Sequence, residues 1–355
     1  MSTLRVTAEV LTVHEHPNAD ALELAQVGLY RAVVAKGAYR TGDAAVYIPE
    51  QAVLPAGLIE ELGLTGRLAG SKADRVKAVR LRGELSQGIV CRPKALGDVD
   101  LALAAAEGTD FAEVLGIAKW VPPIPPTMSG EVESAPDLLP WVDIENIQRY
   151  PDIFTPGEPV VLTEKLHGTA CLLTYVADEE RVHVSSKGFG AKSLALKEDP
   201  RNLYWRAVRG HGVAEAAARV AERLGARRVG IFGEMYGAGV QDLTYGADGR
   251  RESLGYAVFD VSAEIDGRVR WLDAAEVLKG ELPVVPRLFE GPYDIARVLE
   301  VASGRETVSG RELHLREGVV IRPAEERYSP VTGGRAIAKA VSPAYLTRKG
   351  GTEYE

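Results

Sequence analysis

The stretch TEKLHGTA, residues 163–170, decides how the rest of the chain is interpreted. Its lysine, Lys165, stands between two apolar, β-prone runs at 159–162 and 169–176. We therefore expect Lys165 at a turn between strands, where a pocket can lower the pKa of its amine and make it a nucleophile. Gly168 lets the backbone turn sharply and lets a ligand approach closely. A solvent-exposed lysine in a surface hairpin is the alternative that this stretch alone leaves open.

The composition is that of a globular protein of 355 residues, a length that suggests two domains. No apolar run reaches transmembrane length, and the first residues carry no basic and apolar signal. We therefore expect a cytoplasmic protein without a membrane partner. The formal net charge of −8 argues against a protein that coats nucleic acid non-specifically, but it permits a local basic groove.

The cysteines and two of the histidines are assigned structural roles. Cys91 and Cys171 lie in apolar, strand-like surroundings, so we expect reduced core residues rather than a disulfide or a zinc site. His14 and His16 have no third ligand nearby in the sequence. They are therefore interpreted as loop or capping residues and not as metal ligands.

The first part of the chain, residues 1–118, has the several short strands of a small barrel. Within it, HPNADALE at 16–23, followed by KG at 36–37 and GD at 42–43, resembles the OB-fold of the tRNA-binding-domain type. The resemblance implies an OB-fold-like domain that binds nucleic acid.

A change of composition marks the boundary to a second block. The proline-rich segment at 119–150 is expected to be an irregular, stiff linker, with Trp120 and Trp141 fixing it to the domains. Residues 151–355 then combine a helical stripe at 213–224 with several strand-like runs. Antiparallel sheets with a few helices packed on them fit this pattern.

Five motifs follow Lys165 in order. With the lysine stretch they resemble motifs I, Ia, III, IIIa, IV and V of the covalent nucleotidyltransferase superfamily, which comprises DNA ligases, RNA ligases and mRNA capping enzymes. They are SSKG at 185–188, FGEMYG at 232–237, YAVFDV at 256–261, REGVVIR at 316–322 and AIAKAV at 336–341.

The flanking stretches DIENIQRYP at 143–151 and VSPAYL at 341–346 narrow the resemblance. They are similar to the ATP-dependent, nick-sealing RNA ligases of bacteria that carry an N-terminal OB domain. The implied fold class is α+β. An N-terminal OB-fold β-barrel would precede a C-terminal nucleotidyltransferase domain, at 151–355, with ATP-grasp-like antiparallel sheets and helices.

The resemblance implies three in-line phosphoryl transfers. Lys165 attacks the α-phosphate of ATP and expels pyrophosphate, AMP passes to the 5′-phosphate of a strand, and a 3′-hydroxyl displaces AMP. Such a site mainly positions groups and neutralises charge. As the motif V lysine, Lys339 would supply positive charge near the α-phosphate. Glu317 would hold Mg²⁺ or Mn²⁺, both of which prefer oxygen ligands, and Glu234 is a second candidate ligand.

The nucleotide and the RNA would contact further residues. Glu234 would accept hydrogen bonds from the ribose hydroxyls and Phe259 would stack on adenine. Glu164 and the backbone beside Lys165, up to Gly168, would lie at the nucleotide, with Lys187 facing the ribose and the 3′-end. The implied partner is nicked or broken RNA, with an RNA–DNA duplex as a further candidate and no protein partner. The candidates for RNA phosphate contacts are Arg149, Arg322 and Arg335.

The chain departs from the superfamily pattern in two respects, and alternatives stay open. Lys339 stands alone where many members have two lysines spaced two apart. Only sixteen residues follow it, too few for the OB domain that DNA ligases and capping enzymes carry after motif V. The hypothesis is an ATP-dependent RNA ligase that acts in repair. A DNA ligase or a GTP-using capping enzyme, and a non-catalytic tRNA- or nucleic-acid-binding protein, are the alternatives.

Overall fold

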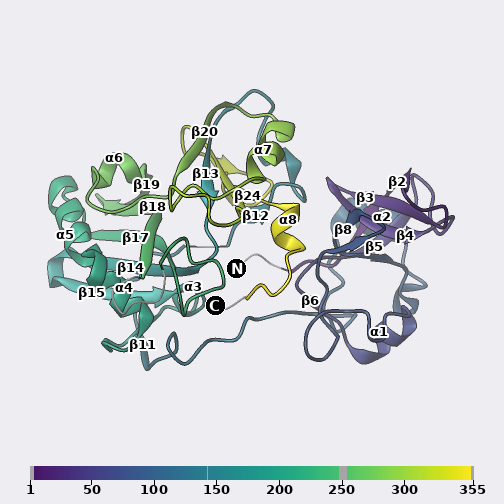
Figure 1. The fold of residues 1–355 in the computed structure, drawn as a ribbon, viewed down its shortest axis with the longest axis horizontal. Helices are drawn as coiled ribbons and strands as arrows, with labels where there is room; N and C mark the ends of the chain where they lie inside the picture. Colours follow the sequence, from purple (N-terminus) through teal and green to yellow (C-terminus); the bar gives the residue numbers. More distant parts are fainter. Residues whose placement is uncertain (1–3, 142, 248–253, 353–355) are drawn as a thin grey trace. The chain divides into compact units, whose positions relative to one another are not determined.

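The computed structural model describes residues 4–141, 143–247 and 254–352, and the chain forms two compact units (Figure 1). The N-terminal unit comprises Ser2–Val121 and Glu145–Asp152. The C-terminal unit comprises Pro122–Ile144 and Ile153–Glu355. Each unit has its own hydrophobic core.

The N-terminal unit is built from short antiparallel strands. Its sheets have the orders β1-β5-β9 and β2-β3-β4, and β6 pairs with β10 and β7 with β8. Alternate side chains of a strand point to opposite faces, and β5 is buried on both: Val46 and Ile48 lie in one core cluster, and Ala45 and Tyr47 lie in another. The elements are β1 Thr7–Val10, β2 Thr12–Glu15, β3 Leu22–Val27, β4 Tyr30–Ala35, β5 Ala44–Ile48, β6 Ala52–Val53, α1 Ala56–Glu61, β7 Val79–Leu81, β8 Glu84–Ser86, β9 Ile89–Cys91, η1 Lys94–Leu96, α2 Leu101–Glu107, β10 Ala118–Lys119 and β12 Glu145–Asn146.

His14 and His16 both form hydrogen bonds within the N-terminal unit. The Asn18 amide donates to His16 Nδ1 at 3.1 Å, and His16 Nε2 lies 3.1 Å from the Leu81 carbonyl. His14 Nε2 lies 2.7 Å from Gln26 Oε1. His16 thus holds the loop, as predicted, whereas His14 lies in β2 rather than in the loop and its side chain connects β2 with β3.

The C-terminal unit contains two antiparallel sheets. The larger has the strand order β11-β16-β15-β14-β17-β18-β19, and the smaller includes the order β24-β21-β13-β20. The elements are β11 Val132–Ser134, β13 Pro159–Lys165, β14 Thr169–Val176, η3 Ala177–Glu179, β15 Arg181–Ser186, α3 Lys187–Gly190, β16 Leu194–Leu196, α4 Leu203–His211, α5 Val213–Leu224, β17 Arg228–Tyr236, β18 Gly255–Ile265, β19 Arg268–Leu272, α6 Ala274–Leu278, β20 Arg287–Pro292, α7 Ile295–Ala302, β21 Gly318–Pro323, β22 Tyr328–Ser329, β23 Gly334–Arg335, β24 Ala338–Val341 and α8 Pro343–Leu346. The short helix η2 Pro151–Ile153 spans the boundary between the two units along the sequence.

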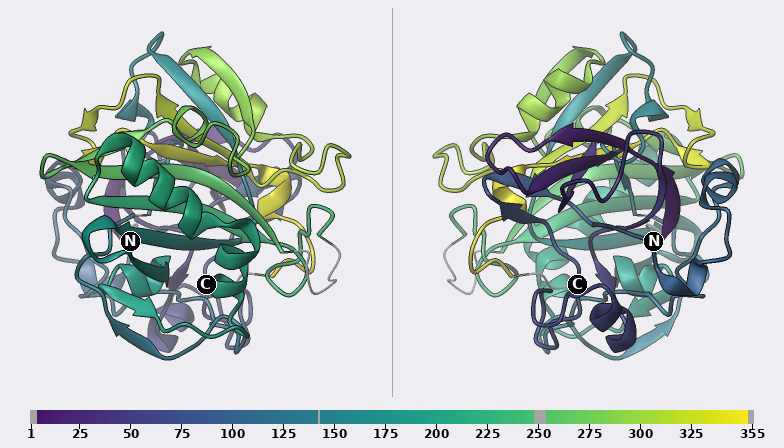
Figure 2. Two further views of the ribbon diagram at one scale, coloured as in Figure 1. Left: turned by 90° about the vertical axis from the view of Figure 1, so that its left-hand side faces the viewer. Right: turned by 90° about the vertical axis from the view of Figure 1, so that its right-hand side faces the viewer.

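Helices α4 and α5 cover one face of the larger sheet, and the left view of Figure 2 shows them in front of its strands. The predicted stripe forms α5, in which Val213, Ala217 and Val220 are fully buried. The helix ends at Gly225, whose φ of 61° is left-handed and open to glycine without strain.

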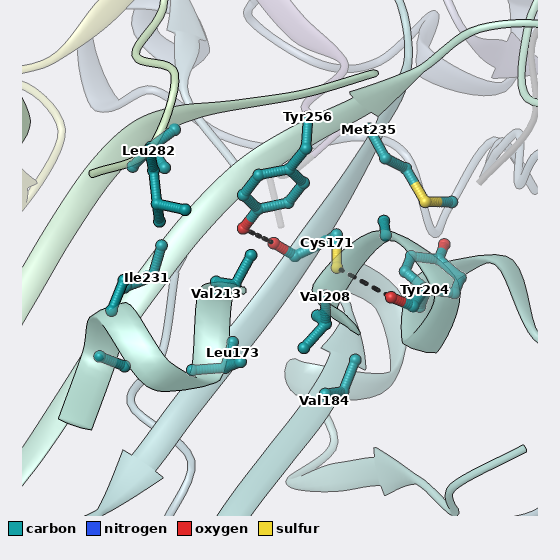
Figure 3. Close-up of a cluster of buried hydrophobic side chains, with 14 of the residues drawn as sticks. Cys171, Leu173, Val184, Tyr204, Val208, Val213, Ile231, Met235, Tyr256 and Leu282 are labelled. Atoms are coloured by element: carbon teal, nitrogen blue, oxygen red, sulfur yellow. Dashed lines mark hydrogen bonds between the residues drawn. The ribbon is translucent and has the colours of Figure 1, made fainter. Parts of the chain in front are cut away.

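The core beneath these helices also contains Cys171 (Figure 3). Its backbone carbonyl accepts a hydrogen bond from the Tyr256 hydroxyl at 3.4 Å. Burial raises the pKa of the Cys171 thiol well above its ordinary value and that of Cys91 to about 12. Both cysteines are free and buried, as predicted.

The proline-rich segment is more ordered than expected. Val132–Ser134 forms β11, an edge strand that pairs with β16. The Arg75 guanidinium lies over the Trp120 ring at 3.8 Å in the N-terminal unit. Trp141 contacts Phe259 in the C-terminal unit, so each tryptophan is fixed within its own unit. Among the described residues, no helix combines the length and the apolar character needed to cross a membrane.

Candidate active site

The stretch 163–170 joins the two sheets of the C-terminal unit. Lys165 ends β13 of the smaller sheet, and Thr169 begins β14 of the larger one. The two strands flanking the lysine therefore do not form a hairpin with each other. A residue at such a junction can face groups from both sheets.

Lys165 forms an ion pair with Glu317. The two groups approach to 2.8 Å between Nζ and Oε1, and their side chains are 24% and 10% exposed. Burial lowers the pKa of the Lys165 amine, but the nearby Glu317 and Glu234 carboxylates outweigh it and raise the pKa above its ordinary value. In the absence of ligands Lys165 is thus a charged ammonium that must lose a proton before it can act as a nucleophile.

Lys339 lies on the same face of the smaller sheet as Lys165. Lys165 pairs with Gly318, and Val320, two residues further along β21, pairs with Lys339. Directly paired residues, and residues two apart on a strand, point to one face. Burial, together with the charges of Lys165 and Lys187, lowers the pKa of Lys339 to about 8. This cluster of ammonium groups suits a polyanionic ligand such as a triphosphate.

Lys187 begins α3, directly after β15. Its ammonium group forms an ion pair with Asp143, an acid whose side chain is only 10% exposed. Asp143 is the first residue of the flanking stretch at 143–151, but no functional role was predicted for it. The indication in the sequence was the position of Asp143 near the end of the proline-rich segment, shortly before the nucleotidyltransferase-like block.

Glu234 of β17 supports the loop that follows Lys165. Its Oε1 accepts a hydrogen bond from the Gly168 amide at 3.0 Å. Burial raises its pKa to about 7, although Lys165 and Lys187 act in the opposite direction. A carboxyl group that titrates near neutrality and lies beside the nucleophile can accept from or donate to ligand hydroxyls.

Phe259 occupies a β-bulge in β18. Phe232 of β17 pairs with Asp260 and Gly233 pairs with Val258, which leaves Phe259 as the extra residue. A bulge re-aims a side chain without ending the strand. Here the ring is half-buried and meets Trp141 edge to face, with the centroids 4.9 Å apart.

The next residue, Asp260, is 1% exposed and connects the two sheets of the unit. Its carboxylate accepts from Arg322 of β21 at 3.3 Å and from Arg335 of β23 at 2.5 Å. It also accepts from the Trp141 indole at 3.0 Å. Arg322 and Arg335 were predicted to contact RNA phosphates, and the structure places both guanidinium groups in this internal network. The network was not foreseen, because nothing in the sequence pairs residues so far apart.

Glu164 faces away from Lys165, because adjacent residues of a strand point to opposite faces. Its carboxylate accepts from the Thr307 amide at 3.0 Å and from the Thr307 hydroxyl at 2.5 Å. Burial raises its pKa. The structure therefore does not bring the Glu164 side chain to the Lys165–Glu317 pair.

Arg149 belongs to the N-terminal unit. It forms an ion pair with Glu9 and donates to the Thr7 hydroxyl at 3.0 Å. Its guanidinium group lies 5.6 Å from the Tyr47 ring centroid. Its predicted contact with RNA stays a prediction.

A divalent cation is compatible with the acids of the site. Glu317 is 8% exposed, and its Oε2 is a buried oxygen without a hydrogen-bond partner. An unpartnered buried carboxylate oxygen is a suitable cation ligand. Within residues 4–141, 143–247 and 254–352, no cluster of three or more histidine, cysteine or acidic side chains could hold a metal by itself. The donor set therefore fits Mg²⁺ or Mn²⁺ held by one or two carboxylates, waters and ligand phosphates.

Comparison with known proteins gives the family. A family model described as RNA ligase matches residues 158–341, and a model described as an OB-fold domain matches residues 4–93. The predicted α+β architecture, an OB-fold before a nucleotidyltransferase fold, is thereby confirmed. No curated protein matches the chain.

Solved structures of the RNA ligase of Naegleria gruberi resemble the chain over nearly its whole length. A lysine-to-alanine mutant with ATP and Mn has a TM-score of 0.77 at 24% identity, covering 97% of this chain and 98% of that one. A glutamate-to-alanine mutant with AMP and Mn has a TM-score of 0.78 at 22% identity, with coverage of 97% and 98%. At such identities the likeness shows the fold, whereas the match of the family model also shows the family: the chain belongs to the RNA ligase family.

Proposed function

We propose that this protein is an ATP-dependent RNA ligase that joins a 3′-hydroxyl end to a 5′-phosphate end. One observation carries the proposal: the amine of Lys165 lies 2.8 Å from Glu317 at the junction of two sheets. Lys339 shares a face of the smaller sheet with Lys165, and the charges of Lys165 and Lys187 lower its pKa, so three cationic side chains form one cluster. A nucleophilic amine, an acid with a free oxygen and clustered cations are what attack on a nucleotide phosphate requires.

Lys165 acts as the nucleophile in the proposed reaction. After its amine loses a proton, the nitrogen bonds to the α-phosphorus of ATP and the bond to pyrophosphate breaks. The 5′-phosphate of an RNA end then takes the AMP and frees the lysine. Finally the 3′-hydroxyl attacks that 5′-phosphate and AMP leaves. Lys339 and Lys187 stabilise the phosphate charges, Glu234 binds the ribose, and Phe259 stacks on adenine.

Glu317 and Glu234 are the residues that would hold Mg²⁺ or Mn²⁺. The unpartnered Oε2 of Glu317 supports this role. The metal would supply positive charge that polarises a phosphate oxygen. Glu317 has a second task, because its Oε1 pairs with Lys165 and keeps that lysine protonated in the absence of ligands.

The proposed substrate is nicked or broken RNA, and the proposed role is repair. An RNA–DNA duplex is a further candidate, and no protein partner is required by the mechanism. The N-terminal unit supports this assignment because an OB-fold domain model matches residues 4–93, and such folds bind nucleic acid. The proposed phosphate contacts remain Arg149, Arg322 and Arg335. Each guanidinium group would contact a phosphate itself or position a neighbouring group that does.

Labelling with radioactive ATP tests the proposal. With Mg²⁺ or Mn²⁺ the wild-type protein should acquire label that survives denaturing electrophoresis, because a phosphoramidate is covalent. Lys165→Ala should lose it entirely, and Lys192→Ala, an exposed lysine on the same unit, should not. Wild type without label would reject the enzyme and leave a non-catalytic binding protein, and label on Lys165→Ala would reject Lys165 as the nucleophile. Label from GTP in place of ATP would favour a capping-type enzyme. Nicked duplexes with RNA or DNA at the 3′-hydroxyl separate RNA ligase from DNA ligase.

A further inference from the structure

The segment that follows β24 folds back onto the loop after Lys165. We call residues 343–352 the C-terminal tail, and Leu166 to Gly168 the nucleophile loop. The point of contact is Asp242, which accepts from His167 Nε2 of the loop at 2.8 Å. Its Oδ1 also accepts from the Thr352 amide at 2.7 Å, and its Oδ2 from Arg348 Nε at 3.3 Å, both of the tail. One carboxylate thus connects the two segments.

The tail also contacts the His167 ring directly. The Tyr345 hydroxyl lies 2.8 Å from Nδ1, while Nε2 faces Asp242. Nε2 also lies 3.2 Å from Arg348 Nη2 of the tail, but the Asp242 carboxylate is nearer and can only accept, so we assign the proton to Nε2 and the Tyr345 hydroxyl donates to Nδ1. Burial lowers the pKa of His167, which favours this neutral form. His167 is 5% exposed, so the orientation of its ring is determined by Asp242, Tyr345 and Arg348.

Three backbone groups of the nucleophile loop form hydrogen bonds with side chains. The His167 amide donates to the Tyr245 hydroxyl at 2.7 Å, and the Gly168 amide donates to Glu234. The Gly168 carbonyl accepts from the Gln241 side chain at 3.2 Å. Gln241 in turn accepts from the Thr352 hydroxyl at 2.8 Å, so the tail also reaches the loop by this second route.

Arg348 is the central residue of the tail. Its guanidinium group donates to both oxygens of Asp242 and to the Tyr345 carbonyl at 3.1 Å, and it lies 3.8 Å above the Tyr345 ring. These donors outweigh partial burial and hold the pKa of Asp242 far below its ordinary range. The lowered pKa favours the charged carboxylate, the form that accepts hydrogen bonds from both segments.

We propose that the C-terminal tail is a positioning clamp for the nucleophile loop, in which Arg348 and Tyr345, through Asp242 and His167, fix the direction of Lys165. The inference rests on the proposed function. In this chain the tail closes on the loop next to Lys165 through Asp242, His167 and Gln241. Arg348 and Tyr345 are positioning residues, since neither touches the reacting atoms.

The clamp should matter for the steps that use Lys165 and not for the last step. Lysine adenylation and AMP transfer form and break the bond to its amine. Joining of an RNA whose 5′ end already carries AMP does not involve that bond. A displaced nucleophile loses about 10²-fold in rate for an ångström of misplacement. A general loss of structure would instead lower all three steps together.

The test compares Arg348→Gln with Lys349→Gln, which removes the same charge from the neighbouring, exposed position of the tail. Single-turnover lysine adenylation at saturating ATP should fall about 30- to 100-fold in Arg348→Gln, with KM for ATP within about threefold. Joining of a pre-adenylated RNA should stay within about threefold of wild type. Lys349→Gln should match wild type in each assay. Equal adenylation by Arg348→Gln and Lys349→Gln would overturn the clamp.

A second variant is needed if Arg348→Gln no longer folds. Misfolding would show as loss of the joining of pre-adenylated RNA in addition to the loss of adenylation. Tyr345→Phe removes only the hydroxyl that donates to His167 and keeps the ring. It should slow adenylation about five- to tenfold and spare the last step. Free guanidinium ion should restore part of the activity of Arg348→Ala. Unchanged adenylation by Tyr345→Phe would reject the clamp. Failure of wild type to adenylate would instead reject the proposed function.

Discussion

At the scale of single residues, Lys339 shows that a cluster of cationic side chains suited to a polyanion lowers the stability of the ligand-free folded protein. Its ammonium group is largely removed from water and faces the charges of Lys165 and Lys187, which together lower its pKa to about 8. The ordinary pKa of a lysine in an unfolded chain is about 10.4. The folded state therefore binds this proton more weakly than the unfolded state, so the charged lysine destabilises the fold.

Replacing this lysine by an apolar residue should stabilise the ligand-free protein. Lys339→Met should raise the free energy of unfolding at pH 7 by about 1 to 3 kcal/mol, since each pKa unit corresponds to about 1.4 kcal/mol. The gain should be complete below pH 8 and should shrink as the pH rises towards 10, because wild-type Lys339 then loses its charge in the folded state. Thermal melts at several pH values measure it.

Lys192→Met provides the control for this comparison. Lys192 is exposed on the same unit, and its replacement should change the stability by no more than about 0.5 kcal/mol at any of these pH values. Lys339→Met should also lose lysine adenylation, because the phosphate loses its cation. A lower melting temperature for Lys339→Met than for Lys192→Met would show that Lys339 stabilises the ligand-free fold.

At the scale of elements, the connection between β13 and β14 depends on the close approach of two backbones. A Cβ atom at Gly168 would lie 2.1 Å from the Met235 carbonyl oxygen of β17. The opposing atom belongs to a strand at the centre of the larger sheet, so it cannot move aside as a flexible side chain would. Glycine is required here for space, and the same contact holds Glu234 beside the nucleophile loop.

Gly168→Ala should therefore abolish most of the adenylation activity, by about 10²-fold or more, because either the loop or β17 must shift. The matched control is Gly210→Ala in α4, where a Cβ atom meets nothing within 4 Å. That substitution replaces glycine in a helix and should stabilise the protein by about 0.5 to 1 kcal/mol with unchanged activity. Equal adenylation by the two variants would show that the loop tolerates displacement.

At the scale of the whole molecule, the two units divide the proposed work between chemistry and RNA binding. All groups proposed for the chemistry lie in the C-terminal unit, as do the nucleophile loop and its clamp. The N-terminal unit supplies an OB-fold and Arg149. RNA binding by such a fold would contribute to the proposed joining of RNA ends, whereas the proposed attack of Lys165 on ATP requires no RNA.

Removal of residues 1–121 should thus spare lysine adenylation within about threefold and lower the joining of nicked RNA at least tenfold, since the RNA loses its binding surface. Adenylation by the same fragment reports whether the C-terminal unit is folded. The fragment begins at the unit boundary, although Glu145–Asp152 then lack the partners they have in the N-terminal unit. Undiminished joining by an adenylating fragment would remove the N-terminal unit from the mechanism.

The sequence was sufficient to predict the fold, and the proposed site residues were chosen from their positions in or beside strands. Lys165, Glu317 and Lys339 lie at strand ends or in apolar strands, where a charged residue stands out from the pattern. Their order along the chain predicted the nucleotidyltransferase fold. The strand at Val132–Ser134 was not predicted, because three residues between prolines are too few to show an alternation of apolar and polar side chains. Its pairing with β16 stabilises it.

Contacts between distant segments could not be predicted. Asp242 and Arg348 lie more than a hundred positions apart and match no motif, so only the folded chain shows that they meet. The bulge at Phe259 arises from the register between β17 and β18, which local sequence does not specify. Likewise, the pairing of Arg322 and Arg335 with Asp260 depends on the packing of two sheets.

The ion pair between Lys165 and Glu317 also affects how the protein withstands chemical damage. Acetylation and carbamylation of a lysine require a free electron pair on its nitrogen, which an ammonium ion lacks. Because the pair with Glu317 raises the pKa of Lys165, the amine stays protonated while no nucleotide is bound. The proposed nucleophile is therefore less reactive towards acylating metabolites than unpaired lysines of lower pKa.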